Sequence, residues 1–332
     1  MTNHILNVEN LRTRFQTPDG EVEAVNDVNF HIDPGETLGV VGESGSGKTQ
    51  IFLAVMGLLA KNGKATGTVR YKDSDILNIP SRQLNKIRGV TMSMIFQDPM
   101  TSLNPFLKIS KQMTEVLVEH RGMSEGDALK RAINMLDRVG IPGAAQRVHM
   151  YPHEFSGGMR QRVMIAMALA NNPRLLIADE PTTALDVTIQ AQILELMLDV
   201  QNKREGSSII LITHDLAVVA EMCDRVAVMY GGMIQEIGSV RQIFKNPLHP
   251  YTQGLLDSIP HPEKGHKVGR LRAIQGNVPN IMKMPHACKF NTRCEHAMSP
   301  LCFDQEPGLA ELEPGHFVRC HLYEESTQAA QG

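Results

Sequence analysis

The stretch that decides the fold is Gly42-Glu43-Ser44-Gly45-Ser46-Gly47-Lys48-Thr49. It matches G-x-x-x-x-G-K-[ST], a pattern in which glycines let backbone N–H groups turn inward around phosphate oxygens. The apolar run Thr37–Val41 is expected to form a buried strand before it, and residues 48–59 a helix after it. Lys48 is expected to reach the β- and γ-phosphates of a nucleotide, and the Thr49 hydroxyl to bind Mg²⁺. The sequence therefore predicts a nucleotide-phosphate site between a strand and a helix.

Two adjacent carboxylates supply a second set of candidate residues. The apolar run Leu175–Ala178 ends in Asp179 and Glu180. Asp179 could hold Mg²⁺ through water, and Glu180 is placed to polarise an attacking water molecule. The alternative is that two acidic residues merely end a strand. A phosphate loop on the same chain favours the catalytic interpretation.

A third motif is Ser156-Gly157-Gly158, which precedes an apolar stretch beginning at Val163. Ser156 is a good helix N-cap, and the two glycines expose the first N–H groups of the expected helix. This would be a second anion site, over a hundred residues after the first. One nucleotide needs only one phosphate loop, so the second site is expected to close over a nucleotide held by another subunit. An ordinary capped helix would explain Ser156 but not the paired glycines.

The remaining pattern predicts an α/β fold. The turn residues Thr17–Gly20 separate expected strands at Leu11–Phe15 and Val22–Val25, and residues 67–71 are expected to form an edge strand. The continuous apolar runs at 175–178 and 209–212 are typical of strands in a parallel sheet that is covered on both faces. Helical periodicity dominates residues 106–170.

Composition excludes several classes of protein. The chain has 332 residues and a formal net charge of −3, which argues against a broad basic surface for nucleic acid. No apolar run approaches the ~18 residues of a membrane-spanning helix, and the first residues do not resemble a signal peptide. We therefore expect a soluble, cytosolic chain that could still dock on a membrane protein.

The order of these motifs resembles that of ABC transporter ATPases over about residues 5–245. The match adds Gln97 in Ile95-Phe96-Gln97-Asp98, Asp186 in Ala184-Leu185-Asp186, and His214. The resemblance implies that Phe15 stacks on adenine and that Gln97 senses Mg²⁺ and the γ-phosphate and couples to a membrane subunit. It implies that Asp186 reaches across a dimer of ATPases. His214 would contact the γ-phosphate and hold the water and Glu180 in place, although by itself it could be an ordinary histidine at a strand end.

The same resemblance implies the domain organisation. A P-loop ATPase core would carry an antiparallel β subdomain and a helical subdomain of about residues 100–165 that holds the signature. The nucleotide-binding domain would span residues 1–250, and a small cysteine-bearing C-terminal domain residues 251–332.

Three stretches resemble the oligopeptide and dipeptide permease branch of the family: Phe96–Pro105, Tyr151–Arg162 and Pro181–Thr188. This implies an importer subunit on the cytoplasmic face of the plasma (inner) membrane, with two transmembrane permease subunits, an extracytoplasmic peptide-binding protein and no nucleic acid. It also implies a second ATPase subunit, with a paralogue favoured over an identical chain. Nickel and glycoside importers share much of the pattern. Non-transport ABC ATPases usually have duplicated cassettes, coiled coils or basic surfaces, which this chain lacks.

Four cysteines gather in the last fifth of the chain: Cys288, Cys294, Cys302 and Cys320. Four thiolates suit either zinc or an iron–sulfur cluster, and spacing does not choose between them. The resemblance favours a [4Fe–4S] cluster. The nearby histidines 286, 296, 316 and 321 keep Zn²⁺ open, and four reduced cysteines in a small core are the third alternative. Cys223 stands apart and is expected to be a buried apolar residue.

Overall fold

The computed structural model describes residues 4–203, 206–258 and 274–323. The chain divides into two compact units, which we describe separately. Unit 1 comprises Met1–Leu6, Ile32–Thr37 and Asn78–Ile212, and unit 2 comprises Asn7–His31, Leu38–Leu77 and Thr213–Gly332. None of the helices in the described part of the chain has the length and hydrophobicity that crossing a membrane requires.

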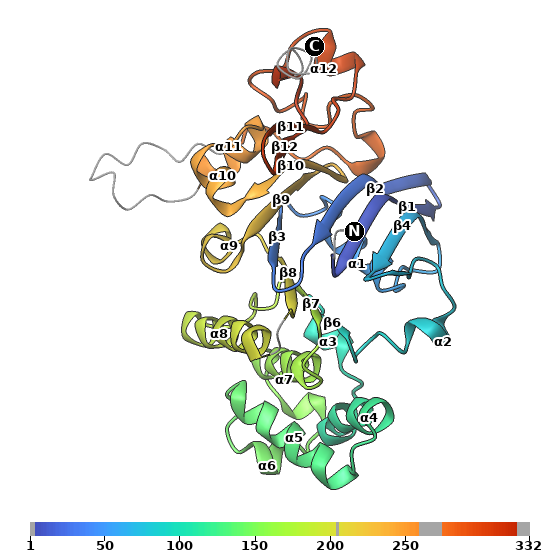
Figure 1. Ribbon diagram of the computed structural model, residues 1–332, viewed down its shortest axis with the longest axis vertical. Coiled ribbons are helices and arrows are strands. Elements are labelled where there is room, and N and C mark those ends of the chain that lie inside the picture. The colour runs from blue at the N-terminus through green and yellow to red at the C-terminus, as the bar shows by residue number, and fades with distance from the viewer. Residues whose placement is uncertain (1–3, 204–205, 259–273, 324–332) are drawn as a thin grey trace, which may run out of the picture. The chain divides into compact units, whose positions relative to one another are not determined.

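Unit 2 contains a four-stranded sheet in the order β2-β1-β4-β5 (Figure 1). Its strands are β1 (Leu6–Thr17), β2 (Gly20–Ile32), β4 (Gly63–Tyr71) and β5 (Ser74–Asp75). The expected turn is confirmed, because only Pro18 and Asp19 separate β1 from β2. The expected edge strand near Gly67 is wrong in position: β4 lies between β1 and β5, and the two-residue β5 occupies the edge.

A second group of strands in unit 2 has the order β11-β12-β10-β9-β3. The strands are β3 (Thr37–Val41), β9 (Arg225–Tyr230), β10 (Met233–Ser239), β11 (Ala310–Glu313) and β12 (His316–Val318). β3 and β9 are parallel, whereas β9, β10, β12 and β11 pair antiparallel. The C-terminal segment therefore returns to add two strands beside β10.

Short helices accompany these strands in unit 2. They are α1 (Lys48–Val55), α9 (Leu216–Met222), α10 (Val240–Lys245), α11 (Pro250–Asp257) and α12 (Leu301–Asp304), with 3₁₀ turns η2 (Ile281–Lys283) and η3 (His321–Tyr323). α1 begins at the expected residue but ends four residues before the predicted end. The reason is local: Gly57 adopts a left-handed φ of 59° directly after the helix cap, which stops the helix.

Unit 1 contains three parallel strands in the order β8-β7-β6. They are β6 (Met92–Ile95), β7 (Leu175–Asp179) and β8 (Ser208–Ile212), and every residue in them is buried. This confirms the two apolar runs as fully buried parallel strands.

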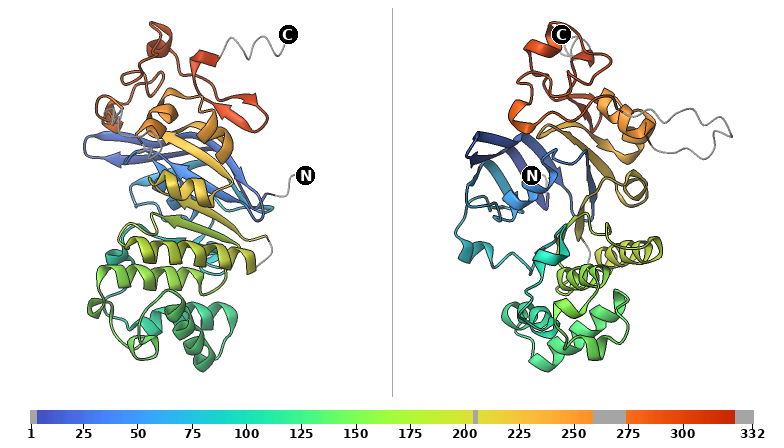
Figure 2. Two further views of the ribbon diagram at one scale, coloured as in Figure 1. Left: turned by 90° about the vertical axis from the view of Figure 1, so that its left-hand side faces the viewer. Right: turned by 180° about the vertical axis from the view of Figure 1, so that it is seen from behind.

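The helices of unit 1 fall mainly between β6 and β8. They are α2 (Ser81–Leu84), α3 (Pro99–Ser102), α4 (Ile109–Arg121), α5 (Glu125–Arg138), α6 (Ala144–Arg147), α7 (Gly157–Leu169) and α8 (Val187–Lys203), with a 3₁₀ turn η1 (Pro152–Glu154). α5 packs against α4, α6 and α7, and both views of Figure 2 show these green helices as one group. α5 places its apolar residues on one face and begins at the N-cap Ser124, whose hydroxyl accepts from Asp127 N–H.

A fully buried carboxylate joins the strands β10 and β12 to the segment that precedes α11. Glu236 on β10 accepts hydrogen bonds of 2.8 Å from the backbone N–H groups of Leu248 and His249. Its Oε1 also lies 2.8 Å from Nε2 of His316 on β12, and both side chains are 0% exposed. Such a carboxylate is stable only while every partner stays in place.

Replacing Glu236 by Ala should therefore destabilise the protein by about 3–5 kcal/mol, because two N–H groups and an imidazole lose their buried acceptor. The free energy of unfolding in urea is the measurement. Glu313→Ala is the matched control: Glu313 lies 4.0 Å from the other nitrogen of His316, but its side chain is 49% exposed. We expect the control to change stability by less than about 0.5 kcal/mol. Equal losses in the two variants would contradict this account of Glu236.

Candidate functional site

Two glycines of the phosphate loop are fixed by neighbouring backbone. A Cβ on Gly42 would lie 2.2 Å from the carbonyl oxygen of Met229, and a Cβ on Gly47 would lie 2.4 Å from that of Ala24. Both glycines also have positive φ, 150° and 95°. No other residue fits at either position without moving a strand, so sterics within unit 2 set the shape of the loop.

Lys48 lies folded into this loop and is only 8% exposed. Its Nζ donates to the carbonyl oxygens of Gly42 at 2.8 Å and Glu43 at 2.9 Å, and to Ser46 Oγ at 3.3 Å. Two carbonyl oxygens and one hydroxyl oxygen thus hold the Lys48 ammonium group, whose positive charge could also attract phosphate oxygens. Ser44 and Gly45 are exposed at the tip of the loop, and Thr49 is half-buried at the start of α1.

Phe15 and His214 also belong to unit 2. Phe15 is half-buried on β1, and its ring lies over Gly63 on β4, where a Cβ would come within 2.6 Å of it. His214 is exposed and follows the end of β8. Both residues therefore present side-chain surface that a ligand could contact.

Unit 1 brings the predicted acidic residues together with Gln97. Asp179 is the last residue of β7 and is 2% exposed, and Glu180 follows it with a left-handed φ of 46°. Gln97 Nε2 donates to Glu180 Oε2 at 3.3 Å, and Thr183 Oγ1 donates to the same oxygen at 3.1 Å. A non-glycine residue with positive φ is typical of strained functional positions. The geometry places Gln97 and Glu180 next to each other.

The signature motif forms the N-terminus of α7 as expected. Ser156 is the N-cap and accepts from Met159 N–H at 3.3 Å. Gly157 is exposed, and a Cβ added to it would meet no atom of the described residues within 4 Å, whereas a Cβ on Gly158 would lie 3.2 Å from the carbonyl oxygen of Ala184. The two glycines therefore differ: Gly157 leaves open space, and Gly158 allows Ala184 and Leu185 to approach the helix.

Asp186 has a structural partner in this chain. Its Oδ1 accepts from Ile189 N–H at 3.0 Å, so it caps the N-terminus of α8. The described contact is intrachain, and a role across a dimer stays a prediction.

One residue that the sequence analysis missed is Gln161, on α7. It is fully buried. Its Nε2 donates to the carbonyl oxygen of Pro181 at 2.7 Å, and its Oε1 accepts from Ala184 N–H at 3.2 Å. Gln161 thus joins the signature helix to the segment directly after Glu180. Gln161 lies between Arg160 and Arg162, ahead of the apolar stretch that begins at Val163, so no local signal in the sequence marks it as buried.

The four C-terminal cysteines lie near one another in unit 2. Cys288 and Cys302 are buried in a cluster with Val41, Tyr230, Tyr251 and Phe290, and Cys294 packs against the same cluster. Burial, together with the charges of the other three cysteines, raises the pKa of Cys320 to about 12. Burial likewise raises the pKa of Cys288 to about 11. Cys223 is half-buried and packs against Gly39 and the same cluster, as an apolar residue would.

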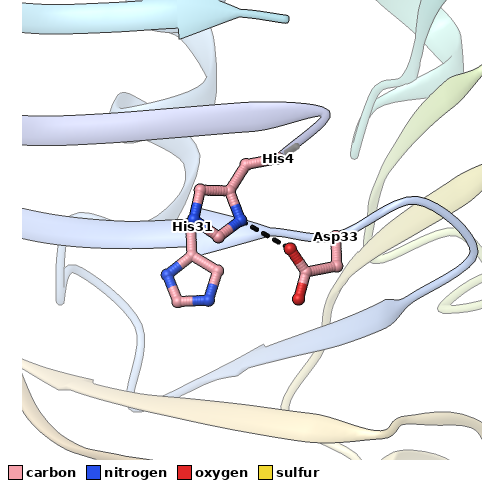
Figure 3. A group of neighbouring side chains, drawn as sticks. All are labelled: His4, His31 and Asp33. Atoms are coloured by element: carbon pink, nitrogen blue, oxygen red, sulfur yellow. Dashed lines mark hydrogen bonds and ion pairs between the residues drawn. The ribbon is translucent and has the colours of Figure 1, made fainter. Parts of the chain in front are cut away.

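Figure 3 draws His4 and Asp33, which belong to unit 1, and His31, which belongs to unit 2. His4 Nδ1 lies 2.5 Å from Asp33 Oδ1. The Arg225 guanidinium lies 3.5 Å from His31 Nε2, and its positive charge disfavours a bound cation. We assign no metal to this group.

Comparison with known proteins gives the class. Residues 25–183 match the family model described as ABC transporter, and residues 235–302 match the one described as oligopeptide/dipeptide transporter, C-terminal region. The chain belongs to the ABC transporter ATP-binding family, as its motifs predicted.

Similar curated proteins narrow the branch. The chain is 53% identical over 317 residues to the oligopeptide transport ATP-binding protein OppD of Escherichia coli, covering 95% of this chain and 92% of that protein. It is 51% identical to the OppD protein of Bacillus subtilis, with coverage of 96% and 88%. It is 49% identical to the dipeptide transport ATP-binding protein DppD of Lactococcus lactis, with coverage of 96% and 90%.

Solved structures agree with the family. A dimeric ATP-binding cassette in a post-hydrolysis state, bound to ADP and Pi, is 28% identical with a TM-score of 0.65 and covers 71% of this chain and 99% of that one. The protein cbiO1 of Clostridium perfringens, part of an ABC transporter complex, is 29% identical with a TM-score of 0.59 and covers 74% and 92%.

Gln161→Leu should lower ATP hydrolysis, because the carbonyl of Pro181 and the N–H of Ala184 lose their buried partner beside Glu180. An unpaired buried group costs about 1–3 kcal/mol, so the segment after Glu180 should shift to regain its hydrogen bonds. ATP affinity should change little, since the substitution leaves Lys48 and the phosphate loop unaltered. The measurements are steady-state hydrolysis and nucleotide binding. Gln146→Leu makes the same chemical change at an exposed site on α6 and should leave both unchanged; hydrolysis equal in the two variants would rule out this role for Gln161.

Proposed function

We propose that this chain hydrolyses ATP to drive the import of oligopeptides or dipeptides through an ABC transporter. The observation that carries the proposal is the loop around Lys48, in which an ammonium group is held by backbone oxygens under two sterically required glycines. An arrangement of this kind binds the phosphates of a nucleotide. The peptide cargo is inferred from the relatives, which are oligopeptide and dipeptide transport proteins.

The phosphate loop, residues 42–49, would bind the triphosphate through its N–H groups and Lys48. Thr49 and Asp179 would hold Mg²⁺, together with Gln97. A hydroxyl, a carboxylate and an amide oxygen are the hard oxygen ligands that this ion prefers, and Asp179 is the last residue of β7. The bound ion would neutralise charge on the phosphates. Phe15 would stack on the adenine.

Glu180 would polarise the attacking water, and its contact with Gln97 supports this assignment. Gln97 donates to the Glu180 carboxylate, so a change in the position of Gln97 would move the general base. His214 would contact the γ-phosphate and hold the water and Glu180 in place. Catalysis would then consist mainly of positioning and charge stabilisation around an in-line transfer.

A second ATPase subunit would complete each site. Ser156, Gly157 and Gly158 would bind the phosphates of a nucleotide held by the partner, and the open space at Gly157 leaves room for one. Asp186 would contact the partner as well. A dimeric relative with ADP and Pi supports two-subunit assembly, and we favour a paralogous partner over an identical chain.

Two transmembrane permease subunits and an extracytoplasmic peptide-binding protein would complete the importer. The chain would be peripheral on the cytoplasmic face of the inner membrane and would not bind nucleic acid. Exposed apolar side chains shortly after Gln97, notably Met100 at 60% and Phe106 at 86% exposed, are suited to contact a permease subunit. This position supports coupling of the permease to Glu180 through Gln97.

We further propose a domain boundary near residue 250, with an antiparallel β subdomain, a helical subdomain of about residues 100–165 and a cysteine-bearing C-terminal domain. The C-terminal cysteines, Cys288, Cys294, Cys302 and Cys320, would hold a [4Fe–4S] cluster. Four cysteines that lie near one another supply the thiolate set that such a cluster requires, and Zn²⁺ is the alternative for the same donor set. The cluster would act as a structural cross-link for a segment with few long apolar runs.

The test of the ATPase proposal is Glu180→Gln. ATP binding should persist, because Lys48, Thr49 and Asp179 remain, while hydrolysis should fall by roughly 10²–10⁴, the usual contribution of a general base. The ATP-bound dimer should then accumulate and be visible by size-exclusion chromatography. Adding Ser156→Arg to this background should abolish the dimer but preserve nucleotide binding by the same chain. Near-normal turnover of the Glu180→Gln complex would refute the assignment.

The cluster is tested by purifying the protein without oxygen. We expect a brown protein with about four iron and four sulfide per chain. Single changes of Cys288 or Cys302 to Ser should remove the colour and loosen residues 280–322 to hydrogen exchange, and Cys223→Ser should do neither. Stoichiometric zinc without sulfide would favour the zinc alternative, and the absence of metal would leave reduced core cysteines.

A further inference from the structure

The second residue of the phosphate loop is held by side chains from the C-terminal part of unit 2. Glu43 N–H donates to the hydroxyl oxygen of Tyr251 at 2.9 Å. The Glu43 carboxylate accepts two hydrogen bonds from the Arg293 guanidinium, at 2.6 and 3.1 Å. The Glu43 carbonyl accepts from Lys48 Nζ. Every polar group of Glu43 is thus engaged, and one of its partners is the lysine of the loop.

Contacts other than Glu43 also hold the Arg293 side chain in place. Its side chain is 4% exposed, and its guanidinium carbon lies 5.7 Å and 6.0 Å from the ring centroids of Tyr230 and Phe290. Its Nε donates to the carbonyl oxygen of Gln275 at 3.1 Å. A planar guanidinium with two parallel bonds to one carboxylate sets direction as well as charge. The position of Glu43 therefore follows that of Arg293.

Arg293 precedes Cys294 in the chain and packs with the aromatic side chains that surround Cys288 and Cys302. Phe290 contacts both Tyr230 and Tyr251, with ring centroids 5.3 and 5.4 Å away. Arg293, which holds Glu43 of the phosphate loop, is therefore part of the four-cysteine segment, although the two residues are 250 apart in sequence.

We propose that Arg293 is a positioning residue for ATP binding: it holds Glu43 so that the phosphate loop keeps the shape that binds the triphosphate. This proposal rests on the proposed ATP site at Lys48 and deepens it. The alternative is that the Arg293–Glu43 pair only stabilises the fold. A purely stabilising pair would lower the free energy of unfolding without changing the affinity of the folded protein for ATP.

The experiment measures the affinity of the full chain for ATP and the KM and kcat of the assembled transporter. Arg293→Met keeps the apolar stem over the two rings and removes the charged fork. We expect the dissociation constant and KM for ATP to rise about tenfold, within the range of coupling between linked sites. kcat at saturating ATP should change by less than about threefold, since the substitution leaves the general base Glu180 unaltered.

Lys289→Met is the matched control. Lys289 is likewise adjacent to a cysteine in the chain, its side chain is 9% exposed, and its Nζ pairs with Glu306 at 2.8 Å, but it has no described contact with the loop. Its loss should lower stability and leave ATP affinity unchanged. Glu43→Gln, on a side chain that is 29% exposed, should raise the dissociation constant without risk to folding. The double variant Arg293→Met/Glu43→Gln should be no worse than the more severe single variant, because both changes break one contact.

Two results would overturn the proposal: wild-type ATP affinity in a folded Arg293→Met or Glu43→Gln protein, or effects of the two changes that simply add. Lys48→Ala separates this failure from failure of the ATP site itself. If Lys48→Ala abolishes binding and Arg293→Met does not change it, only the role of Arg293 is refuted. If Lys48→Ala binds ATP normally, the proposed site is refuted.

Discussion

The close approach of two backbone carbonyls to the phosphate loop is the constraint on which the rest of the site depends. Met229 and Ala24 lie so near Gly42 and Gly47 that neither glycine could carry a side chain. In the loop held between these two carbonyls, Lys48 Nζ donates to the carbonyl oxygens of Gly42 and Glu43. The strands β2 and β9 therefore impose glycine at the two positions of the loop that the sequence pattern also requires.

In unit 1, the helix α7 has two roles, one at its N-terminus and one at its contact with the segment after Glu180. Its first turn carries the open Gly157 and Gly158 after the N-cap Ser156, and Gln161 follows in the next turn. Gly158 lies close to Ala184, and Gln161 bonds to the backbone of Pro181 and Ala184. A displacement of α7 would therefore move the segment that directly follows Glu180.

The C-terminal segment is integrated into unit 2 and is more than an appendage. It adds β11 and β12 beside β10. The buried Glu236 on β10 binds both His249, at the start of α11, and His316 on β12. Tyr251 and Arg293 extend the same packing to Glu43. A buried charge that is fully paired resists displacement, because loss of one partner strands the other. The C-terminal segment and the phosphate loop should therefore move together.

The sequence by itself determined the family, the loop at 42–49, the buried strands at 37–41, 175–178 and 209–212, and the signature helix with its N-cap. These features depend on residue type at fixed local spacing, so periodicity and glycine placement reveal them. It misjudged the end of α1 and the place of β4, since one depends on a single left-handed glycine and the other on strand order. Only the tertiary structure showed the buried Gln161, the helix cap made by Asp186, and the contact between Arg293 and Glu43. Those contacts join residues far apart in the chain or settle between competing local partners, and no local pattern records which partner a polar side chain will meet.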